Sequence, residues 1–391
     1  MATALVSGVQ YSGIWNINSQ ANAKAAGTWP LAPVPGLYSW GRNTDGQLGL
    51  GNTTSYSSPK QVGSLTNWAS ISTNSYSVHT LAVKTDGTLW AWGSNSYGQL
   101  GLGNVTYYSS PKQVGALTAW LKITTAYAAS FSIKTDGTLW SWGNNTYGKL
   151  GLNNETNYSS PKQIGALTNW SNIAGGNFGC IAIKTDGTIW TWGYNADGRL
   201  GLGNLTNYSS PKQIGALTTW LKVFSGYSSG FGINTSGAMW GWGRNGAGQL
   251  GLGDVTTRSS PVQIGALTTW SSVSSSAGGT SANGFTLSTK TDGTLWGWGI
   301  NAHGQLGLGN TTPYSSPVQV GSLTTWSSVA GGSSSTLATT SGGALWAWGR
   351  NNNGQLGLGN TTNYSSPKQV GSLTNWLTIA SGPYFCIGIA S

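Results

Sequence analysis

The chain has 391 residues, of which only 7% are charged, with a formal net charge of +10, 61 glycines and 22 tryptophans. It is too rich in aromatic and aliphatic side chains to be disordered, and no apolar run reaches the roughly 18 residues of a membrane-spanning helix. The start of the chain also lacks the basic and apolar regions of a signal peptide, so we expect a folded chain without a membrane span or a classical secretion signal.

Residues 1–36 differ in composition from the rest of the chain. A short helix is predicted over 19–26, ended by Gly27 and followed by the proline-punctuated linker PLAPVPG. The run GIWNINSQANAKAAGTWP resembles the N-terminal pieces of structural proteins from tailed bacteriophages. The resemblance implies an anchoring segment that contacts other virion or surface structural proteins, and a disordered leader is the alternative.

Residues 37–391 are built from one repeated unit. The signature WGRNTDGQLGLGN begins at Trp40 and returns with small changes at Trp92, Trp142, Trp192, Trp242, Trp298 and Trp348. The spacings are 52, 50, 50, 50, 56 and 50 residues, and a period of this size indicates a solenoid or a propeller. Each unit shows short alternating runs and no helical periodicity, which favours an all-β propeller as a single domain.

Four antiparallel strands are expected in each unit. In the unit that starts at Trp120 they fall over 120–128, 129–135, 138–143 and 159–165. The Asp-Gly of KTDGT joins the second and third strands, because this dipeptide favours the tight hairpin turns whose twist matches that of the strands. The chain stops after a second strand, whereas residues 36–63 supply a third and a fourth. We therefore predict seven blades, with the ring closed by N- and C-terminal strands that share the last blade.

The repeat tryptophans are interpreted as structural. Trp90 and Trp92 stand two apart in a strand and point to the same face, so one row of indoles per blade is expected to pack on the neighbouring blade. We read these rings as framework in preference to a sugar-binding stack. The repeated glycines mark positions of positive φ or close approach, and a nucleotide-binding loop is rejected because no helix follows.

The unit W-G-x-N-x-x-G-Q-L-G-L-G, preceded by T-D-G-T-L-W, resembles the repeat of the regulator of chromosome condensation family. The resemblance covers residues 37–391 and implies a seven-bladed propeller. The family's His-Thr-Leu-Ala stretch is matched once, at His79, which we read as a packing residue because other units have Ala129 or Gly179 there. Family functions range from nucleotide exchange on small GTPases to enzyme inhibition, and no catalytic residue of an exchange factor can be matched here.

No catalytic, cofactor or metal site is predicted. Four of the eight acidic residues stand in TDG turns, and His79 and His303 lie in different contexts, so neither a carboxylate pair nor a metal-ligand spacing emerges. Cys180 and Cys386 hold equivalent positions in non-adjacent blades and are expected to be free thiols. The repeated lysines of SSPKQ and KTDG form dispersed rings, which argues for a solvated periphery and against nucleic-acid binding.

A recognition face is predicted from the loops. Connections between strands one and two, and between strands three and four, fall on the same side of a meander, and these are the long and variable ones. The loop-rich rim would display interface-type residues, namely Arg42, Tyr97, Tyr127, Tyr147, Phe178, Tyr227, Arg244, Arg350 and Tyr384. The glycine- and serine-rich insertion over 274–283 lies on this rim as a mobile flap, a subunit contact or a merely tolerated loop.

The leading functional hypothesis is a non-enzymatic, virion-associated or surface-exposed structural and adhesion protein, phage-like, anchored through residues 1–36. Its loop-rich rim would bind a glycan or protein receptor. The alternative is an intracellular, cytoplasmic propeller that binds a protein partner, as a GTPase regulator or an enzyme inhibitor.

Overall fold

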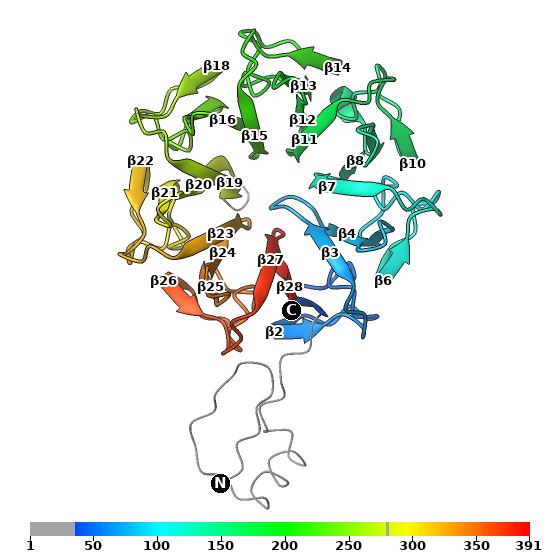
Figure 1. The fold of residues 1–391 in the computed structure, drawn as a ribbon. Coiled ribbons are helices and arrows are strands. Elements are labelled where there is room, and N and C mark those ends of the chain that lie inside the picture. The colour runs from blue at the N-terminus through cyan, green and yellow to red at the C-terminus, as the bar shows by residue number, and fades with distance from the viewer. Residues whose placement is uncertain (1–35, 279–280) are drawn as a thin grey trace, which may run out of the picture.

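The computed structural model describes residues 36–278 and 281–391, which form seven four-stranded antiparallel sheets arranged around a central axis (Figure 1). This confirms the all-β, seven-bladed propeller. The helix predicted over 19–26 and the linker that follows it lie outside the described residues, apart from Gly36, which opens the first strand. The anchoring role of residues 1–36 therefore stays a prediction.

In each blade one strand lines the axis and the last strand lies at the periphery (Figure 1). From the inner strand outward, the first four blades along the chain are β3 (Trp68–Ser72), β4 (His79–Lys84), β5 (Leu89–Gly93) and β6 (Tyr108–Gln113); β7 (Trp120–Ala126), β8 (Ala129–Lys134), β9 (Leu139–Gly143) and β10 (Tyr158–Gln163); β11 (Trp170–Gly175), β12 (Gly179–Lys184), β13 (Ile189–Gly193) and β14 (Tyr208–Gln213); and β15 (Trp220–Ser225), β16 (Ser229–Asn234), β17 (Met239–Gly243) and β18 (Arg258–Gln263). The other three are β19 (Trp270–Gly278), β20 (Ser281–Lys290), β21 (Leu295–Gly299) and β22 (Tyr314–Gln319); β23 (Trp326–Gly331), β24 (Ser335–Thr340), β25 (Leu345–Gly349) and β26 (Tyr364–Gln369); and β27 (Trp376–Ser381), β28 (Phe385–Ala390), β1 (Gly36–Gly41) and β2 (Tyr56–Gln61).

The closing blade is shared by both ends of the chain. Strand β1 pairs with β28 in an antiparallel register that runs from Gly36 opposite Ala390 to Gly41 opposite Phe385. Figure 1 shows this seam, with β2 in blue beside β27 and β28 in red. The predicted closure is confirmed, and it leaves no unpaired edge between β1 and β28.

The core lies between blades as a series of apolar clusters, one at each junction. At one junction the side chain of Trp142 is fully buried against Leu81, Leu89 and Leu100 of the preceding blade. Its indole N–H also donates a hydrogen bond of 2.9 Å to the carbonyl of Gln99. Each junction repeats this bond at 2.9 to 3.0 Å, from Trp40 to Gln355, Trp92 to Gln47, Trp192 to Lys149, Trp242 to Arg199, Trp298 to Gln249 and Trp348 to Gln305.

The motif glycines allow this junction to form. Gly101 has a φ of 74°, and a Cβ there would lie 2.8 Å from Nε1 of Trp142. Both the left-handed backbone and the close indole exclude a larger side chain. The prediction that these glycines serve positive φ and close approach is confirmed.

The KTDGT segment is more than a hairpin turn. The carboxylate of Asp136 accepts hydrogen bonds from the backbone N–H and the hydroxyl of Thr138, and that hydroxyl accepts the indole N–H of Trp140 at 2.8 Å. Lys134 lies across the indole, with Nζ 3.8 Å from the ring centroid of Trp140 and 4.8 Å from that of Trp120. The turn therefore orders two aromatic rings and one cation.

Two predictions need correction here. The KTDG lysines were expected at a solvated periphery, but Lys84, Lys134, Lys184 and Lys290 are at most 8% exposed because each lies over two tryptophans. The SSPKQ lysines, such as Lys162, are exposed. The insertion over 274–283 was expected to be a loop, whereas it lengthens β19 and β20 into a longer hairpin, with residues 279–280 outside the described part of the chain.

Two substitutions of Trp142 measure separately what the hydrogen bond and the packed ring contribute to stability. Trp142→Phe removes the donor to the Gln99 carbonyl but keeps a buried ring, and should cost about 1 to 3 kcal/mol. Trp142→Ala also removes the packed volume and should cost about 3 to 5 kcal/mol. Urea unfolding followed by circular dichroism measures both, with Leu121→Ala at an exposed position as the control. Equal losses from the two Trp142 variants would show that the hydrogen bond, not packing, dominates.

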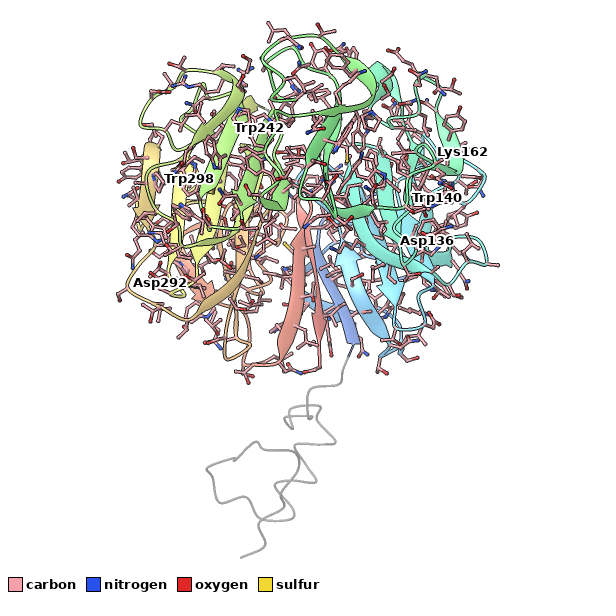
Figure 2. The ribbon with its side chains drawn as sticks, turned by 45° about the horizontal axis from the view of Figure 1, so that its top comes forward. Asp136, Trp140, Lys162, Trp242, Asp292 and Trp298 are labelled. Carbon is pink, nitrogen blue, oxygen red and sulfur yellow. The ribbon has the colours of Figure 1, made fainter. Side chains whose placement is uncertain are left out.

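Two lysines of one blade should differ in their effect on stability. Figure 2 labels one of them, Lys162, together with Trp140, over whose ring the other, Lys134, lies. Lys134→Ala removes a buried cation–aromatic contact and should lower the free energy of unfolding by about 1 to 2 kcal/mol. Lys162→Ala removes an exposed side chain, whose Nζ is 5.5 Å from the Tyr158 ring, and should change it by less than about 0.5 kcal/mol. The same urea titration tests the pair, and similar effects from both would contradict the buried role of Lys134.

Candidate functional site

The two kinds of long connection do share one face, named here the loop-rich face. The backbone N–H of Arg42, which follows β1, donates to the carbonyl of Tyr384, which precedes β28, at 2.9 Å. Asn144 and Ala128 repeat this contact at 2.8 Å in another blade. On the opposite face the N–H of Trp120 donates to the carbonyl of Gly87 in a short turn. The predicted assignment of faces therefore agrees with the structure.

The repeat changes its chemistry at two neighbouring positions of this face. Five units carry Gln in GQLGLG, and its Oε1 accepts a backbone N–H two residues earlier, as from Tyr97 to Gln99 at 2.9 Å. In the blades of β7–β10 and β11–β14 that Gln is replaced by Lys149 and Arg199. Neither cation can accept the N–H, so the local turn is free to differ.

Lys149 is buried without an acidic partner among the described residues. Its side chain is 3% exposed, its Nζ donates to the carbonyl of Tyr127 at 2.7 Å, and it lies 5.4 Å from the centroid of that ring. Burial lowers the pKa of Lys149 to about 7. The preceding Tyr147 takes a left-handed φ of 64° within a short 3-10 turn over 146–148, so the Gln-to-Lys change alters both charge and shape.

His79 lies near Lys149 and is fully buried. Burial and, secondly, the charge of Lys149 lower the pKa of His79 to about 3, so the imidazole is neutral at physiological pH. Its Nε2 lies 2.8 Å from the hydroxyl of Ser130, which donates to the Gln99 carbonyl. These contacts agree with the reading of His79 as a packing residue.

Arg199 lies between two aromatic rings. Its guanidinium carbon is 4.7 Å from the centroid of Phe178 and 4.8 Å from that of Tyr194, and one Nη pairs with the carboxylate of Asp197. Burial lowers the pKa of Arg199, and Asp197 opposes that shift. The side chain is 8% exposed, and neither its Nε nor its Nη1 has an acceptor among the described residues.

The rings around Arg199 form a continuous chain that spans several blades. Tyr147 stacks on Tyr194 at 4.3 Å, Tyr194 contacts Phe178 at 5.5 Å, Phe178 meets Tyr227 edge to face at 5.4 Å, and Tyr227 meets Tyr76 at 5.2 Å. Such offset and edge-on contacts are the favourable arrangements for aromatic pairs. Together with Lys149 and Arg199, these five residues are named here the cation–aromatic cluster.

Tyr76 reaches this cluster because its loop crosses the axis end of other blades. The amide of Asn74 donates to the carbonyl of Thr125 and, at 3.3 Å, to that of Gly175, and the hydroxyl of Ser77 donates to the carbonyl of Ala126 at 2.9 Å. The loop between β3 and β4 is thereby fixed to β7 and β11. A central cavity of about 390 Å³ lies beside it, and its lining holds no charged side chain.

The nine predicted rim residues divide into groups. Tyr147, Phe178 and Tyr227 belong to the cation–aromatic cluster, and Tyr127 lies beside it over Lys149. A second group holds Tyr384 between Arg42 and Arg350, at 5.8 and 5.9 Å from its ring centroid. Within the described residues Tyr97 and Arg244 make no ring contact with either group, so their part in recognition at the rim stays a prediction.

Four residues of the cluster were not predicted, namely Tyr76, Lys149, Tyr194 and Arg199. The signal for two of them stands in the sequence, since GKLGLN and GRLGLG replace the usual GQLGLG in consecutive units. No such signal exists for Tyr76, because its contact with Tyr227 depends on how a loop crosses the ring.

Across residues 36–278 and 281–391, no three His, Cys, Asp or Glu side chains gather as a metal site would require. The same residues contain no helix with the length and apolar character needed to cross a bilayer. Cys180 and Cys386 are buried and unbridged, as predicted.

Comparison with protein families matches two kinds of model. The RCC1-like domain model covers residues 35–283, and the regulator of chromosome condensation (RCC1) repeat model covers 292–339 and 342–389. Among curated proteins, human Protein RCC2 is 43% identical over 79 residues, which are 20% of this chain and 15% of that protein. The ultraviolet-B receptor UVR8 of Arabidopsis thaliana is 40% identical over 78 residues, 20% of this chain and 18% of the receptor.

Solved structures share the fold. Human WBSCR16 gives a TM-score of 0.79 at 22% identity, covering 92% of this chain and 99% of that one. Yeast RCC1 (Prp20), solved bound to Kap60, gives 0.81 at 18% identity, with 100% and 97% covered. At these identities the likeness concerns the fold alone. None of these matches supports the phage-like reading of residues 1–36, and with it virion placement and host attachment lose their basis.

Replacing Lys149 by Gln, the residue that five other units carry at this position, should stabilise the chain in a pH-dependent manner. The pKa of Lys149 is about 7 in the folded state and about 10.4 in an unfolded chain. The unfolded state therefore binds more protons between these values, and the stability of the unmodified chain rises with pH across this window. Lys149→Gln should be more stable by on the order of 2 kcal/mol at pH 6, with the difference shrinking towards pH 10.

Urea titrations of both chains at pH 6, 8 and 9.5 measure this difference. Lys162→Gln, at an exposed position in the same blade, is the control and should track the unmodified chain. A stability difference that stays constant with pH would contradict the burial of an ammonium at position 149.

Proposed function

Since the chain belongs to the family of RCC1-like domains, we propose that it is a non-enzymatic propeller that binds an acidic segment of a partner protein at the cation–aromatic cluster. The matched relatives are aligned over a fifth or less of their own length, so their activities are not transferred. The proposal rests on the geometry of the loop-rich face.

The observation that carries the proposal is the incomplete pairing of Arg199. Its guanidinium is held rigidly between Phe178 and Tyr194 and is only partly neutralised by Asp197. A cavity of about 20 Å³, lined by Arg199, Phe178 and Tyr227, has room for about one small oxygen-sized group. A carboxylate oxygen placed in this cavity would accept hydrogen bonds from the buried N–H groups of Arg199, which are costly to leave unpaired.

The surroundings favour a protein partner. Tyr147 is 39% exposed and Tyr127 47% exposed beside the buried cations, and Tyr and Arg are the residues that dominate protein interfaces. Lys149 adds a second positive charge when protonated. The structure of Prp20p is described together with its binding to Gsp1p and histones, so a protein ligand is compatible with this fold.

The absence of an enzymatic role is part of the proposal. In the TDGT turns the carboxylate accepts hydrogen bonds from its own turn, as Asp136 does from Thr138, and such groups are poorly placed for acid–base work. Action inside a cell, as a GTPase regulator or an enzyme inhibitor, was the alternative hypothesis from the sequence, and it is now the preferred one.

An acidic peptide tests the proposal. A fluorescein-labelled peptide of alternating Glu and Leu should bind, as measured by anisotropy, and Arg199→Gln should weaken it by about tenfold or more, the effect of one close charge pair. Gln is the residue that five other units carry at this position, so the variant is expected to fold. Arg244→Gln on the same face, outside the cluster, should change the affinity by less than about twofold.

Three results would count against the proposal. Equal weakening by the two variants would indicate nonspecific attraction to a cationic protein. Tighter binding of a labelled oligodeoxythymidine than of the peptide would favour nucleic acid. Retention of full peptide affinity by Arg199→Gln would remove the cluster as the site.

A further inference from the structure

The tryptophan pairs on the sides of the blades hold a cation in four units. The Nζ atoms of Lys84, Lys134, Lys184 and Lys290 lie 3.8, 3.8, 3.6 and 3.6 Å from the ring centroids of Trp90, Trp140, Trp190 and Trp296. A second indole stands 4.8 to 5.2 Å from each Nζ, from Trp68, Trp120, Trp170 and Trp270. Two indoles that face one ammonium form an aromatic cage, the arrangement that attracts such cations.

Two other units keep the cage but not the lysine. Trp220 and Trp240 lie 6.2 Å apart at 75°, and Trp326 and Trp346 lie 6.1 Å apart at 75°. The pairs that hold lysine lie 6.1 to 6.4 Å apart at 76° to 82°. The two indoles therefore keep nearly the same arrangement where no lysine lies between them.

The residue opposite the first indole is what differs. Lys134 pairs with Trp120 across β7 and β8, and in the same register Asn234 pairs with Trp220 and Thr340 with Trp326. Neither side chain carries a charge or reaches as far as a lysine.

In the two units that lack the lysine, the turn between the second and third strands also differs. Ala238 and Ala344 replace the threonine that accepts the indole N–H elsewhere, and the Nε1 atoms of Trp240 and Trp346 have no acceptor among the described residues. In the closing blade Tyr38 and Ala390 occupy the corresponding positions, with Ala390 opposite Trp376, so the tryptophan pair itself is missing there.

A largely apolar cavity adjoins the cage of the β15–β18 blade. It has a volume of about 350 Å³ and is lined by Trp220, Trp240, Leu217 and Pro261, and Leu217 is 49% exposed at its edge. The equivalent cavity beside Trp190 counts Lys184 among its lining residues. The cavity can thus cover the methylene stem of a long side chain whose end reaches the indoles.

We infer that the Trp220–Trp240 and Trp326–Trp346 pairs are binding sites for lysine side chains of a partner protein. The chain's own lysines identify the ligand, because the same pair of rings receives an ammonium in four other units. The two sites lie beside the short turns opposite the loop-rich face, since Trp220 and Trp326 donate their backbone N–H groups to the carbonyls of the turn glycines Gly187 and Gly293. Their blades are separated by the β19–β22 blade, and they are distinct from the cation–aromatic cluster on the loop-rich face. This inference is independent of the proposed binding of an acidic segment.

The test uses the whole chain and the peptide acetyl-Gly-Ser-Lys-Ser-Gly-amide. Indole N–H signals in ¹H–¹⁵N spectra report each tryptophan separately. Saturable shifts are expected at Trp240 and Trp346 and not at Trp190, whose site is filled by Lys184. A matched peptide with norleucine in place of lysine keeps the stem but lacks the ammonium, and it should cause no saturable shift.

One substitution provides the internal control. Asn234→Lys supplies the missing lysine, so it should weaken the peptide response at Trp240 by about tenfold or more, while Trp346 responds as before. Asn234→Gln should leave both responses intact. An equal response to the norleucine peptide would assign the cavity to apolar side chains and overturn the inference. So would shifts at Trp190, no response at either pair, or an undiminished response in Asn234→Lys.

Discussion

The ring depends on one hydrogen bond that crosses each junction between blades. A buried indole donates to a backbone carbonyl of the preceding blade at 2.9 to 3.0 Å, and it can approach only because a glycine faces it. The seven indoles are also the largest fully buried side chains of the described residues. The strict spacing of tryptophan and glycine in every unit follows from this contact, since a change in either would remove the bond between the indole and that carbonyl.

The same contact explains where the repeat can vary. The acceptor is the main-chain oxygen of the residue that is Gln in five units, so the side chain at that position takes no part in the junction. Lys149 and Arg199 keep their carbonyls in place for Trp192 and Trp242 while their side chains turn to aromatic partners. The cation–aromatic cluster therefore occupies the ring without altering the hydrogen bonds that hold the blades together.

The sequence predicts the fold well because each unit repeats its own local rules. The strands of the unit from Trp120, the Asp136–Gly137 turn and the closure at Gly36 all follow from alternation and turn chemistry, and the structure agrees within about two residues. The site is predicted only in part. Phe178 and Tyr227 could be placed on a face, but their contact with Arg199 and Tyr76 depends on distances between blades that no local pattern encodes. Lys134 was misplaced because a lysine beside a turn usually points to solvent, whereas here two indoles cover it.

The junction at the seam has the same indole-to-carbonyl hydrogen bond as the others, but its two partners lie far apart in the sequence. Trp40 and Gln355 are 315 residues apart, whereas the other partners are separated by 43 to 49. Six junctions can thus form as successive units meet, but the seventh requires closure of almost the whole chain, which is slow because loop entropy must be overcome before the contact forms. Until β1 reaches β28 the nearly complete ring is an open arc with an unpaired strand at its end, and such an edge can recruit the same strand of another molecule. The order of folding, and the concentration at which this chain folds without association, are therefore set at the seam.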